Sequence, residues 1–261
     1  MRPRVLFIRV LFLACVAAAA QAQQVLIYDD NSNDHVAQEA CAALGYSCTT
    51  GNSSNFVTLL TGQQWNLVVM DLPSTEPTGD WQTPLAAHIA AGGSAIQTGW
   101  DASDFTTLAA SFEVTLGATH NPLTLYRWNG STLFITPRPV PNPLAWIDDS
   151  WGDNGFYLTA TGSAVEAAGF VASPTPGQAA IVIGNGGRTI FNGFLFDDYY
   201  PGDANSDGIA DAVELVENEM ASALGAGIQP IPTLDAAGLA VLALLLAGIG
   251  IALLITRRVV G

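Results

Sequence analysis

The stretch Trp65-Asn-Leu-Val-Val-Met70 decides the fold of this chain. It is a short, mostly apolar run that ends at Asp71 and Pro73, which is the pattern of a strand buried inside a sheet. We therefore predict a buried strand over 65–70, with the neighbouring segments arranged around it.

Strand and helix patterns alternate on both sides of this stretch. The first strand runs over 24–28 and leaves the sheet at Asp29 and Asp30. A helix follows Asp34 and ends at Gly45. Strands separated by helices indicate a parallel, doubly wound α/β sheet. The remaining segments are a strand at 46–50, a helix near 56–60, a helix at 81–91 and a strand at 94–98.

The second half of the chain is richer in strand patterns. Gly184-Asn185-Gly186-Gly187 separates two apolar runs and predicts a hairpin turn, and a last helix is predicted over 210–224. We therefore expect antiparallel hairpins added to the parallel sheet. The candidate strands are 112–116, 123–128, 132–136, 164–172, 180–183 and 188–196.

This order of elements resembles the class I glutamine amidotransferase-like fold, a flavodoxin-like family that includes ThuA-like domains. The resemblance spans 24–224, and its carriers are the Gly-Gly turn and strand at 91–100 and the hairpin from Gly184 to Arg188. Active members place a nucleophilic Cys on the elbow after the strand that here reads Ala95-Ile-Gln-Thr98. No Cys stands there in this sequence, so the resemblance implies the fold without the amidotransferase activity.

The tail of the sequence carries a different pattern. Residues 236–255 form a run of 20 residues without charge, and Arg257 and Arg258 follow it. At about 1.5 Å per helical residue, such a run crosses a bilayer core of about 30 Å. Because lipid leaves backbone groups no water to bond, we expect a transmembrane helix over 236–255. The Arg pair places its end on the cytoplasmic side.

The segment Ile231-Pro232-Thr233-Leu234 lies just before this run. Together with Gly238, the Leu/Ala-rich span and the basic end, it resembles the IPTL-CTERM sorting domain over 231–258. That family is similar to the PEP-CTERM tails of Gram-negative bacteria. The resemblance implies that an exosortase-type membrane protease recognises and processes the tail. One departure is Ala236-Ala237, where that family usually has a Trp.

The beginning of the sequence predicts export. A basic start, an apolar run and the small residues around Gln21 are typical of a secretory signal peptide over 1–22. The body then covers 23–225, and a Gly/Pro spacer at 226–230 separates it from the tail. We expect the body to be anchored to the inner membrane on the periplasmic side and then processed to the cell surface or secreted.

The body is strongly acidic. The chain has 8 Lys and Arg against 23 Asp and Glu residues, none of the basic residues is Lys, and only Arg127, Arg138 and Arg188 lie in the body. Such a surface repels phosphate backbones, which excludes nucleic acid as a partner, and it attracts cations.

Two Cys residues, Cys41 and Cys48, lie in the body on either side of Gly45. An oxidising compartment allows them to form a disulfide. The alternative is a pair of small buried thiols, because a sequence does not determine the geometry that a disulfide needs.

Acidic and aromatic residues fall at the predicted strand ends. Open parallel sheets bind ligands at the carboxyl ends of their strands. A carboxylate-lined cleft there would suit a cation or a sugar, such as an extracellular polysaccharide. The alternative is that these Asp residues only cap helices and turns. The residues concerned are Asp29, Asp30, Asp71, Trp100 and Asp101.

The segment 203–214 matches the EF-hand calcium loop at every ligand position. Gly208 allows its sharp turn, but 194–199 has a strand pattern where an entering helix is usual. The alternative is an Asx-rich linker that caps the last helix. The candidate ligands are the side chains of Asp203, Asn205 and Asp207, the carbonyl of Ile209, Asp211 through water and Glu214 through both oxygens.

Together these features favour an exported structural or binding module of the cell envelope, without catalytic activity. The competing hypothesis is an envelope hydrolase that acts on carbohydrate from the acidic strand-end cleft. Two carboxylates about 5–10 Å apart in one pocket would favour the hydrolase. Scattered, solvated Asp side chains would favour the binding module.

Overall fold

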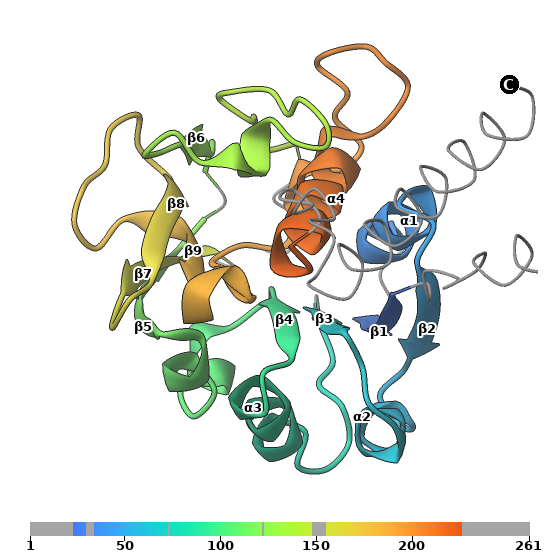
Figure 1. Cartoon of the computed structure of the whole chain (residues 1–261). Coiled ribbons are helices and arrows are strands. Elements are labelled where there is room, and N and C mark those ends of the chain that lie inside the picture. The colour runs from blue at the N-terminus through green and yellow to red at the C-terminus, as the bar shows by residue number, and fades with distance from the viewer. Residues whose placement is uncertain (1–22, 30–33, 73, 122, 148–154, 226–261) are drawn as a thin grey trace, which may run out of the picture. The chain divides into compact units, whose positions relative to one another are not determined.

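The computed structural model describes residues 23–29, 34–72, 74–121, 123–147 and 155–225. Within these ranges, ten strands form one mixed sheet (Figure 1). Eight of them follow one another along the sheet, β8 pairs with β9, and β6 pairs with β8. The strands, in sheet order, are β2 (Ser47–Gly51), β1 (Gln24–Asp29), β3 (Leu67–Asp71), β4 (Ser94–Gln97), β10 (Thr189–Asn192), β9 (Ala179–Gly184), β7 (Gly155–Ala160) and β5 (Val114–His120), with β8 (Val165–Gly169) and β6 (Tyr126–Arg127) beside them.

The first half of the chain supplies the parallel part of the sheet. β1 pairs in parallel with β2 and with β3, and β3 pairs in parallel with β4. These pairings confirm that the strands around Val25, Val68 and Ala95 are parallel neighbours. The alternation of strand and helix therefore predicted this part of the α/β fold correctly.

Helices cover both faces of this parallel part (Figure 1). Side chains that alternate along the strands point to opposite faces. Those of Val25 and Ile27 pack in one apolar cluster with α1 (Val36–Ala43) and α4 (Asp211–Ala223). Those on the other face, such as Leu26, pack in a second cluster with α2 (Phe56–Gly62) and α3 (Gln82–Ala90).

β10 joins the two halves of the sheet. It pairs in parallel with β4 and antiparallel with β9. The connection between β9 and β10 is a single 3₁₀ turn, η4 (Asn185–Gly187), in which Gly186 and Gly187 have φ values of 68° and 99°. Such positive φ values favour Gly, and the hairpin predicted at 184–187 is confirmed.

Two predicted strands are wrong, and a third is much shorter than predicted. Residues 132–136 contain the 3₁₀ helix η3 (Thr132–Phe134), because the Ser131 side chain accepts a hydrogen bond from the N–H of Leu133 and starts a turn. Residues 194–199 contain the 3₁₀ helix η5 (Phe196–Tyr199). The predicted strand 123–128 is reduced to the two residues of β6.

The structure also differs at two places where local signals were weak. No strand was predicted over 155–160, which is β7. There Phe156 and Leu158 are fully buried against the second apolar cluster. The residue that precedes α1 is His35 in the left-handed conformation, so the N-cap position falls at His35, one residue after the predicted Asp34.

Cys41 of α1 and Cys48 of β2 form a disulfide, with their Cα atoms 6.3 Å apart. The bond ties the first helix to the outermost parallel strand, in addition to the apolar contacts of α1.

The chain divides into two compact units, residues 1–225 and 226–261. The predicted signal peptide (1–22), spacer (226–230) and sorting tail (231–258), with its transmembrane helix at 236–255, lie outside the described residues. In the part of the chain that the structure describes, no helix is both long enough and apolar enough to cross a membrane.

Candidate functional site

Two of the predicted cleft carboxylates are neighbours at the carboxyl ends of β1 and β3. Asp29 and Asp71 are partners in the parallel register of these strands, so their backbones are one strand spacing apart, about 4.8 Å. Asp29 is only 7% exposed and Asp71 only 1% exposed. The strand ends therefore hold two covered carboxyl groups and not two solvated ones.

The residues around the start of α1 hold the Asp29 carboxylate in place. His35 Nδ1 lies 2.8 Å from Asp29 Oδ2, and Gln38 Nε2 donates to the same oxygen over 2.7 Å. The hydrogen bond with Asp29 raises the pKa of His35, because the carboxylate stabilises the imidazolium form. These contacts give Asp29 a fixed position and give His35 a positive charge over a wider pH range.

The other predicted cleft residues have different surroundings. Asp101 Oδ1 accepts the N–H of Ser103 over 2.8 Å and caps the 3₁₀ helix η1 (Ala102–Phe105), which is the capping role given as the alternative. The Trp100 side chain is partly exposed. Asp30 lies outside the described residues.

The turn after β4 is filled by packing and hydrogen bonds. Gln97 and Thr98 are fully buried, and the Thr98 hydroxyl donates to the carbonyl of Phe194. A Cβ atom placed on Gly99 would lie 2.3 Å from Cζ of Phe105, which is closer than two carbon atoms can approach. A larger residue at position 99 would therefore require the Phe105 ring to move.

The loop before α4 is organised by its own side chains. Asp203 accepts the N–H groups of Asp207 and Gly208 over 3.1 Å and 3.0 Å, and Asp207 accepts the N–H of Ile209 over 2.9 Å. Gly208 has a φ of 90°, which its lack of a side chain permits. The N-cap of α4 is Ala210 and makes no side-chain bond, so these acidic residues do not cap α4.

The first turn of α4 sends two carboxylates back towards this loop. Asp211 Oδ2 accepts the N–H of Ala204, and Glu214 Oε2 accepts from Asn205 Nδ2, each over 3.0 Å. Asp211 is 3% exposed and Glu214 is fully buried. The second oxygens, Asp211 Oδ1 and Glu214 Oε1, are buried and accept no hydrogen bond within the described part of the chain, and the Glu214 carboxyl lies against that of Asp207.

Burial and mutual repulsion change the acidity of this cluster. Burial raises the pKa of Glu214 to about 7, and the neighbouring Asp207 and Asp211 carboxyls contribute to the rise. Burial also raises the pKa of Asp211, and Asp203 and Asp207 add to it. Carboxyls that raise one another's pKa values are stabilised in their charged form by a nearby cation.

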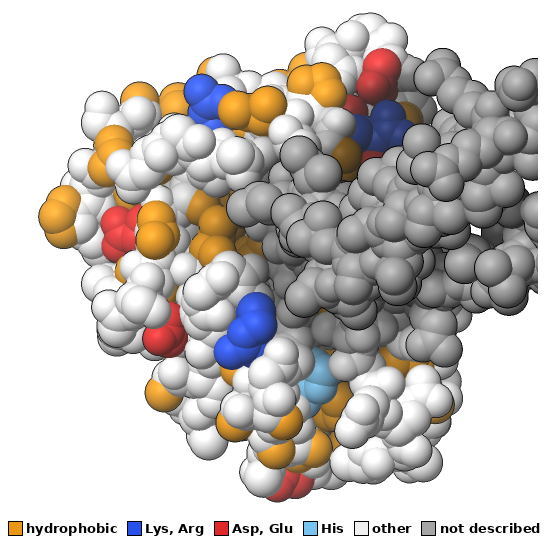
Figure 2. Space-filling model, viewed as in Figure 1, with side chains coloured by type: hydrophobic (Ala, Val, Ile, Leu, Met, Phe, Trp, Pro, Cys, Tyr) orange, Lys and Arg blue, Asp and Glu red, His pale blue; other side chains and the backbone are white. Residues whose placement is uncertain are grey.

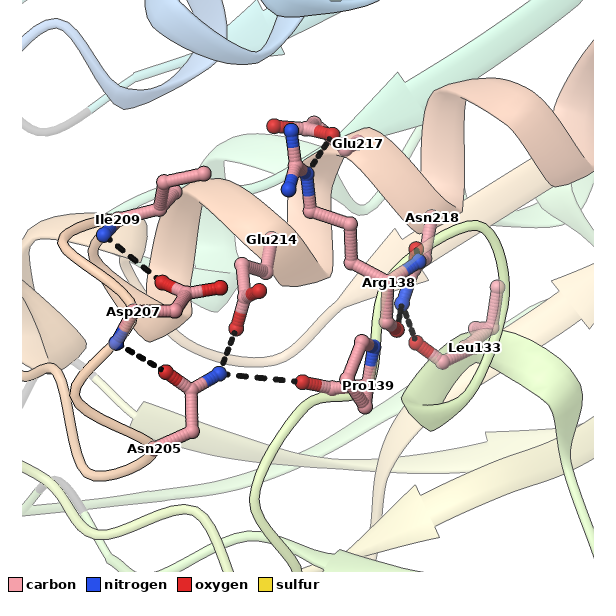
Figure 3. A network of polar contacts seen from close by, with 9 residues as sticks. All are labelled: Leu133, Arg138, Pro139, Asn205, Asp207, Ile209, Glu214, Glu217 and Asn218. Atoms are coloured by element: carbon pink, nitrogen blue, oxygen red, sulfur yellow. Dashed lines mark hydrogen bonds and ion pairs between the residues drawn. The ribbon is translucent and has the colours of Figure 1, made fainter.

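A segment from the second half of the fold docks against the loop and α4 (Figure 3). Asn205 Nδ2 donates to the Pro139 carbonyl over 3.4 Å, and Arg138 Nε donates to Glu217 Oε2 over 2.7 Å. Figure 3 shows the Glu214 carboxylate pointing towards Asn205 and away from the Arg138 guanidinium, which bonds Glu217. The loop and the docked segment thus share one polar network.

Asn218 completes this docking from the following turn of α4. Its Nδ2 donates to the carbonyls of Leu133 and Arg138 over 2.8 Å and 2.7 Å, and its Oδ1 accepts the N–H of Arg138 over 2.8 Å. Asn218 is fully buried. One side chain therefore satisfies three backbone groups of the segment.

The candidate calcium ligands are brought to one loop, although the described residues contain no group of three or more His, Cys, Asp or Glu side chains that could hold a metal ion as arranged. The four predicted carboxylate ligands are therefore not placed around one ion as they stand, and the other two ligands are the Asn205 amide and the Ile209 carbonyl. Oxygen atoms alone make up the predicted set, and such sets suit hard cations such as Ca²⁺.

Sequence analysis did not find the residues that hold the docked segment. Arg138 is one of only three Arg residues in the body, and Glu214, Glu217 and Asn218 share one side of a helix because they are three or four residues apart. These two features were visible in the sequence. They did not show that Arg138 pairs with Glu217 and Asn218, because the partners lie about eighty residues apart in the chain.

Comparison with known proteins identifies the tail. Residues 229–258 match the IPTL-CTERM motif. The match includes the predicted sorting segment 231–258 and ends at the same residue. No curated protein matches the chain in sequence.

The body resembles solved structures in fold alone. A protein assigned as a GMP synthase component from Thermoplasma acidophilum superposes with a TM-score of 0.52 at 10% identity, over 78% of this chain and 96% of that one. This similarity supports the α/β fold. A protein assigned as ThuA-like from Parabacteroides merdae has a TM-score of 0.44 at 12% identity, covering 81% of this chain and 94% of that one. A glutamine amidotransferase from Methylobacillus flagellatus has a TM-score of 0.45 at 10% identity, with coverages of 80% and 96%.

Proposed function

We propose that this protein is exported and sorted through its IPTL-CTERM tail, and that its body is a structural or binding module of the cell envelope. The observation that carries this proposal is the match of residues 229–258 to the IPTL-CTERM motif. In this proposal the apolar run 236–255 anchors the chain in the inner membrane. Arg257 and Arg258 keep its end in the cytoplasm.

Two features of the body support an address outside the cytoplasm. The disulfide between Cys41 and Cys48 suits an oxidising compartment. The basic side chains on the face shown in Figure 2 are separate from one another and form no basic patch there, which agrees with the excess of acidic residues in the sequence. A body of this kind is suited to the solvent outside the cell and not to nucleic acid.

The packing of the sheet supports a body without catalytic activity. The elbow after β4 is occupied by buried Thr98 and by Gly99, which Phe105 crowds. The competing hydrolase needs two carboxylates that a carbohydrate can reach. Asp29 and Asp71 are neighbours but are almost fully covered, so they do not supply that accessible pair. They are not the solvated side chains expected of a binding module either, and the binding module rests on the acidic body and its tail.

The partner that we propose for the tail is an exosortase-type membrane protease. It would recognise the segment Ile231–Leu234, in which Pro232 restricts the backbone to extended or turn conformations and removes one hydrogen-bond donor. Recognition would thus depend on Pro232, whereas membrane anchoring would depend on the apolar run that follows.

The separation of these two roles can be tested in the native host. The Pro232→Ala chain should stay in the membrane fraction at full length, whereas the wild type is shortened and released. The matched control is Pro230→Ala, which removes a neighbouring proline outside the Ile-Pro-Thr-Leu segment and should leave processing unchanged. Fractionation and mass spectrometry of the C-terminus measure both results.

Deletion of 236–258 gives the complementary result, a soluble body that needs no processing to leave the membrane. Release of the Pro232→Ala chain with the same C-terminus and at the same rate as wild type would show that the segment is not recognised. The tail would then be an ordinary anchor.

A further inference from the structure

The loop before α4 has a feature that the sorting function does not use. Its residues carry the spacing D-x-N-x-D-G-x₅-E from Asp203 to Glu214, and the structure folds them into a tight loop whose amides bond the Asp203 and Asp207 carboxylates. This pattern alone would describe an Asx-rich turn. A ligand is indicated by two further carboxylates, at the start of α4.

These carboxylates contribute a pair of buried oxygens. Asp211 Oδ1 and Glu214 Oε1 lie on residues that are at most 3% exposed, and neither accepts a hydrogen bond in the described part of the chain. The Glu214 carboxyl instead lies against the acidic side chain of Asp207. A buried carboxylate oxygen without a partner is costly. Both carboxylates face the loop, because their other oxygens accept from Ala204 and Asn205 of that loop.

We propose that the loop from Asp203 to Glu214 binds one Ca²⁺ ion, and that the ion strengthens the attachment of the segment around Pro139 to α4. The cation would take oxygens from Asp203, Asn205, Asp207 and Glu214 and the carbonyl of Ile209, with Asp211 acting directly or through a water molecule. Glu214 Oε1 and Asp211 Oδ1 would then have a partner.

Binding would require the ligand side chains to rearrange, because their carboxylates do not surround one ion as they stand. In the structure, the Asn205 amide stands between the loop and Glu214, to which its Nδ2 donates. The Glu214 carboxyl already lies against Asp207, and exchange of its bond from Asn205 for the cation would bring both of its oxygens to the ion. Asn205 can then offer Oδ1 to the cation while its Nδ2 still donates to the Pro139 carbonyl. This shared residue is the reason why the cation would stabilise the docked segment.

The ligand set favours Ca²⁺ over Mg²⁺. It offers six or more oxygens on a loop whose geometry can adjust, which suits the larger ion, whereas Mg²⁺ requires a near-ideal octahedron and retains its waters. The entering element is the short 3₁₀ helix η5 and not a full helix. We therefore expect a dissociation constant of about 10⁻⁴–10⁻³ M, the range of extracellular sites.

Calorimetry on the full-length chain in detergent micelles tests the proposal directly. After chelator treatment, CaCl₂ should give a saturable heat with one ion per chain. About 10 mM CaCl₂ should raise the unfolding midpoint by a few degrees, because binding to the folded state stabilises it by mass action. The same concentration of MgCl₂ should give a smaller shift.

Variants locate the ion. Glu214→Gln and Asp203→Asn each remove one charge from the proposed site and should weaken Ca²⁺ binding by about tenfold or more. The matched control is Glu76→Gln, which removes a charge from an exposed residue before α3, can still accept from Trp81 Nε1 and should bind like wild type. Circular dichroism shows whether each variant is folded.

Either of two results would overturn the proposal. One is the absence of a saturable heat and of a midpoint shift in the wild type at about 10 mM Ca²⁺, a result that needs no variant. The other is equal binding by Glu214→Gln, Asp203→Asn and Glu76→Gln, which would indicate diffuse attraction to the acidic surface. Neither result depends on the tail, so failure here leaves the sorting proposal intact.

Discussion

At the scale of single residues, the most unusual group is the carboxyl of Glu219. It is fully buried beside Asn192, whose Nδ2 donates to Glu219 Oε2 over 3.0 Å. Burial raises the pKa of Glu219 to about 8, although the Asn192 hydrogen bond opposes the rise. Asn192 Oδ1 and Glu219 Oε1 both have no partner within the described residues. A protonated Glu219 has an O–H that can donate to Asn192 Oδ1 and satisfy both atoms.

This pKa predicts how stability changes with pH. Between about pH 4.5 and pH 8 the folded state keeps the proton on Glu219 and the unfolded state loses it. Protonated Glu219 therefore contributes its full stabilisation below about pH 4.5. Between about pH 4.5 and pH 8, the free energy of unfolding falls by up to about 1.4 kcal/mol for each unit of rising pH. Glu219→Gln, which stays neutral and can still pair with Asn192, should remove that decline.

Urea unfolding of wild type and Glu219→Gln at pH 5, 6.5 and 8 measures the effect. The stability of the variant relative to wild type should increase with pH. The control is Glu39→Gln, an exposed change on α1 that should follow the wild-type pH dependence. Parallel curves for wild type and Glu219→Gln would mean that Glu219 is ionised in the folded protein.

At the scale of elements, α4 holds the segment around Arg138 mainly through the Asn218 side chain. η3 and the Pro-rich stretch after it do not pair with the sheet as strands. The hydrogen bonds of Asn218 hold them in place instead. Asn218→Leu keeps the approximate size of the side chain but leaves the Arg138 N–H and the carbonyls of Leu133 and Arg138 without their partner.

We expect Asn218→Leu to lower the free energy of unfolding by about 3 kcal/mol or more, since each unsatisfied buried group costs about 1–3 kcal/mol. Asn218→Asp can still accept from the Arg138 N–H, and its protonated carboxyl can also donate to one of the two carbonyls, so this variant should lose less at low pH than at high pH. Ser222→Ala on the last turn of α4 is the control and should change stability by less than about 0.5 kcal/mol. Chemical denaturation measures all three. A loss for Asn218→Leu no greater than that of the control would show that the segment is held by its apolar contacts alone.

At the scale of the whole molecule, the chain combines an acidic α/β body with a tail that matches a sorting motif. Membrane retention in our proposal depends on the apolar run and not on the body. Leu245→Arg places a charge near the middle of 236–255, where Arg costs about 2.5–3.5 kcal/mol for insertion. We expect this variant to be largely lost from the membrane fraction.

Leu245→Phe is the matched control, because it changes the size of the same side chain and keeps it apolar, so it should be retained like wild type. Alkaline extraction of membranes followed by immunoblotting separates the two outcomes. Retention of Leu245→Arg at the wild-type level would mean that something other than 236–255 holds the chain at the membrane.

The parallel strands, the Gly-rich hairpin, the loop spacing from Asp203 to Glu214 and the sorting tail could all be predicted from the sequence. Each depends on residues that are close together in the chain: an apolar run such as 65–70, a turn that needs Gly at 186 and 187, or a fixed spacing of oxygen-bearing side chains. Local preference and hydrophobic burial act in the same direction in these segments.

Only the tertiary structure decided the elements and contacts whose causes are distant in sequence. Residues 132–136 have a strand-like composition but form η3, where the Ser131 cap and the docking to Asn218 replace strand pairing. Asp29 and Asp71 were expected in an open cleft, but packing covers both of them. The pairing of Glu219 with Asn192 and of Arg138 with Glu217 depends on which surfaces of α4 meet the sheet and the loop. Burial and hydrogen-bond partnership are set by folding, because the groups that exclude water from a side chain belong to other segments.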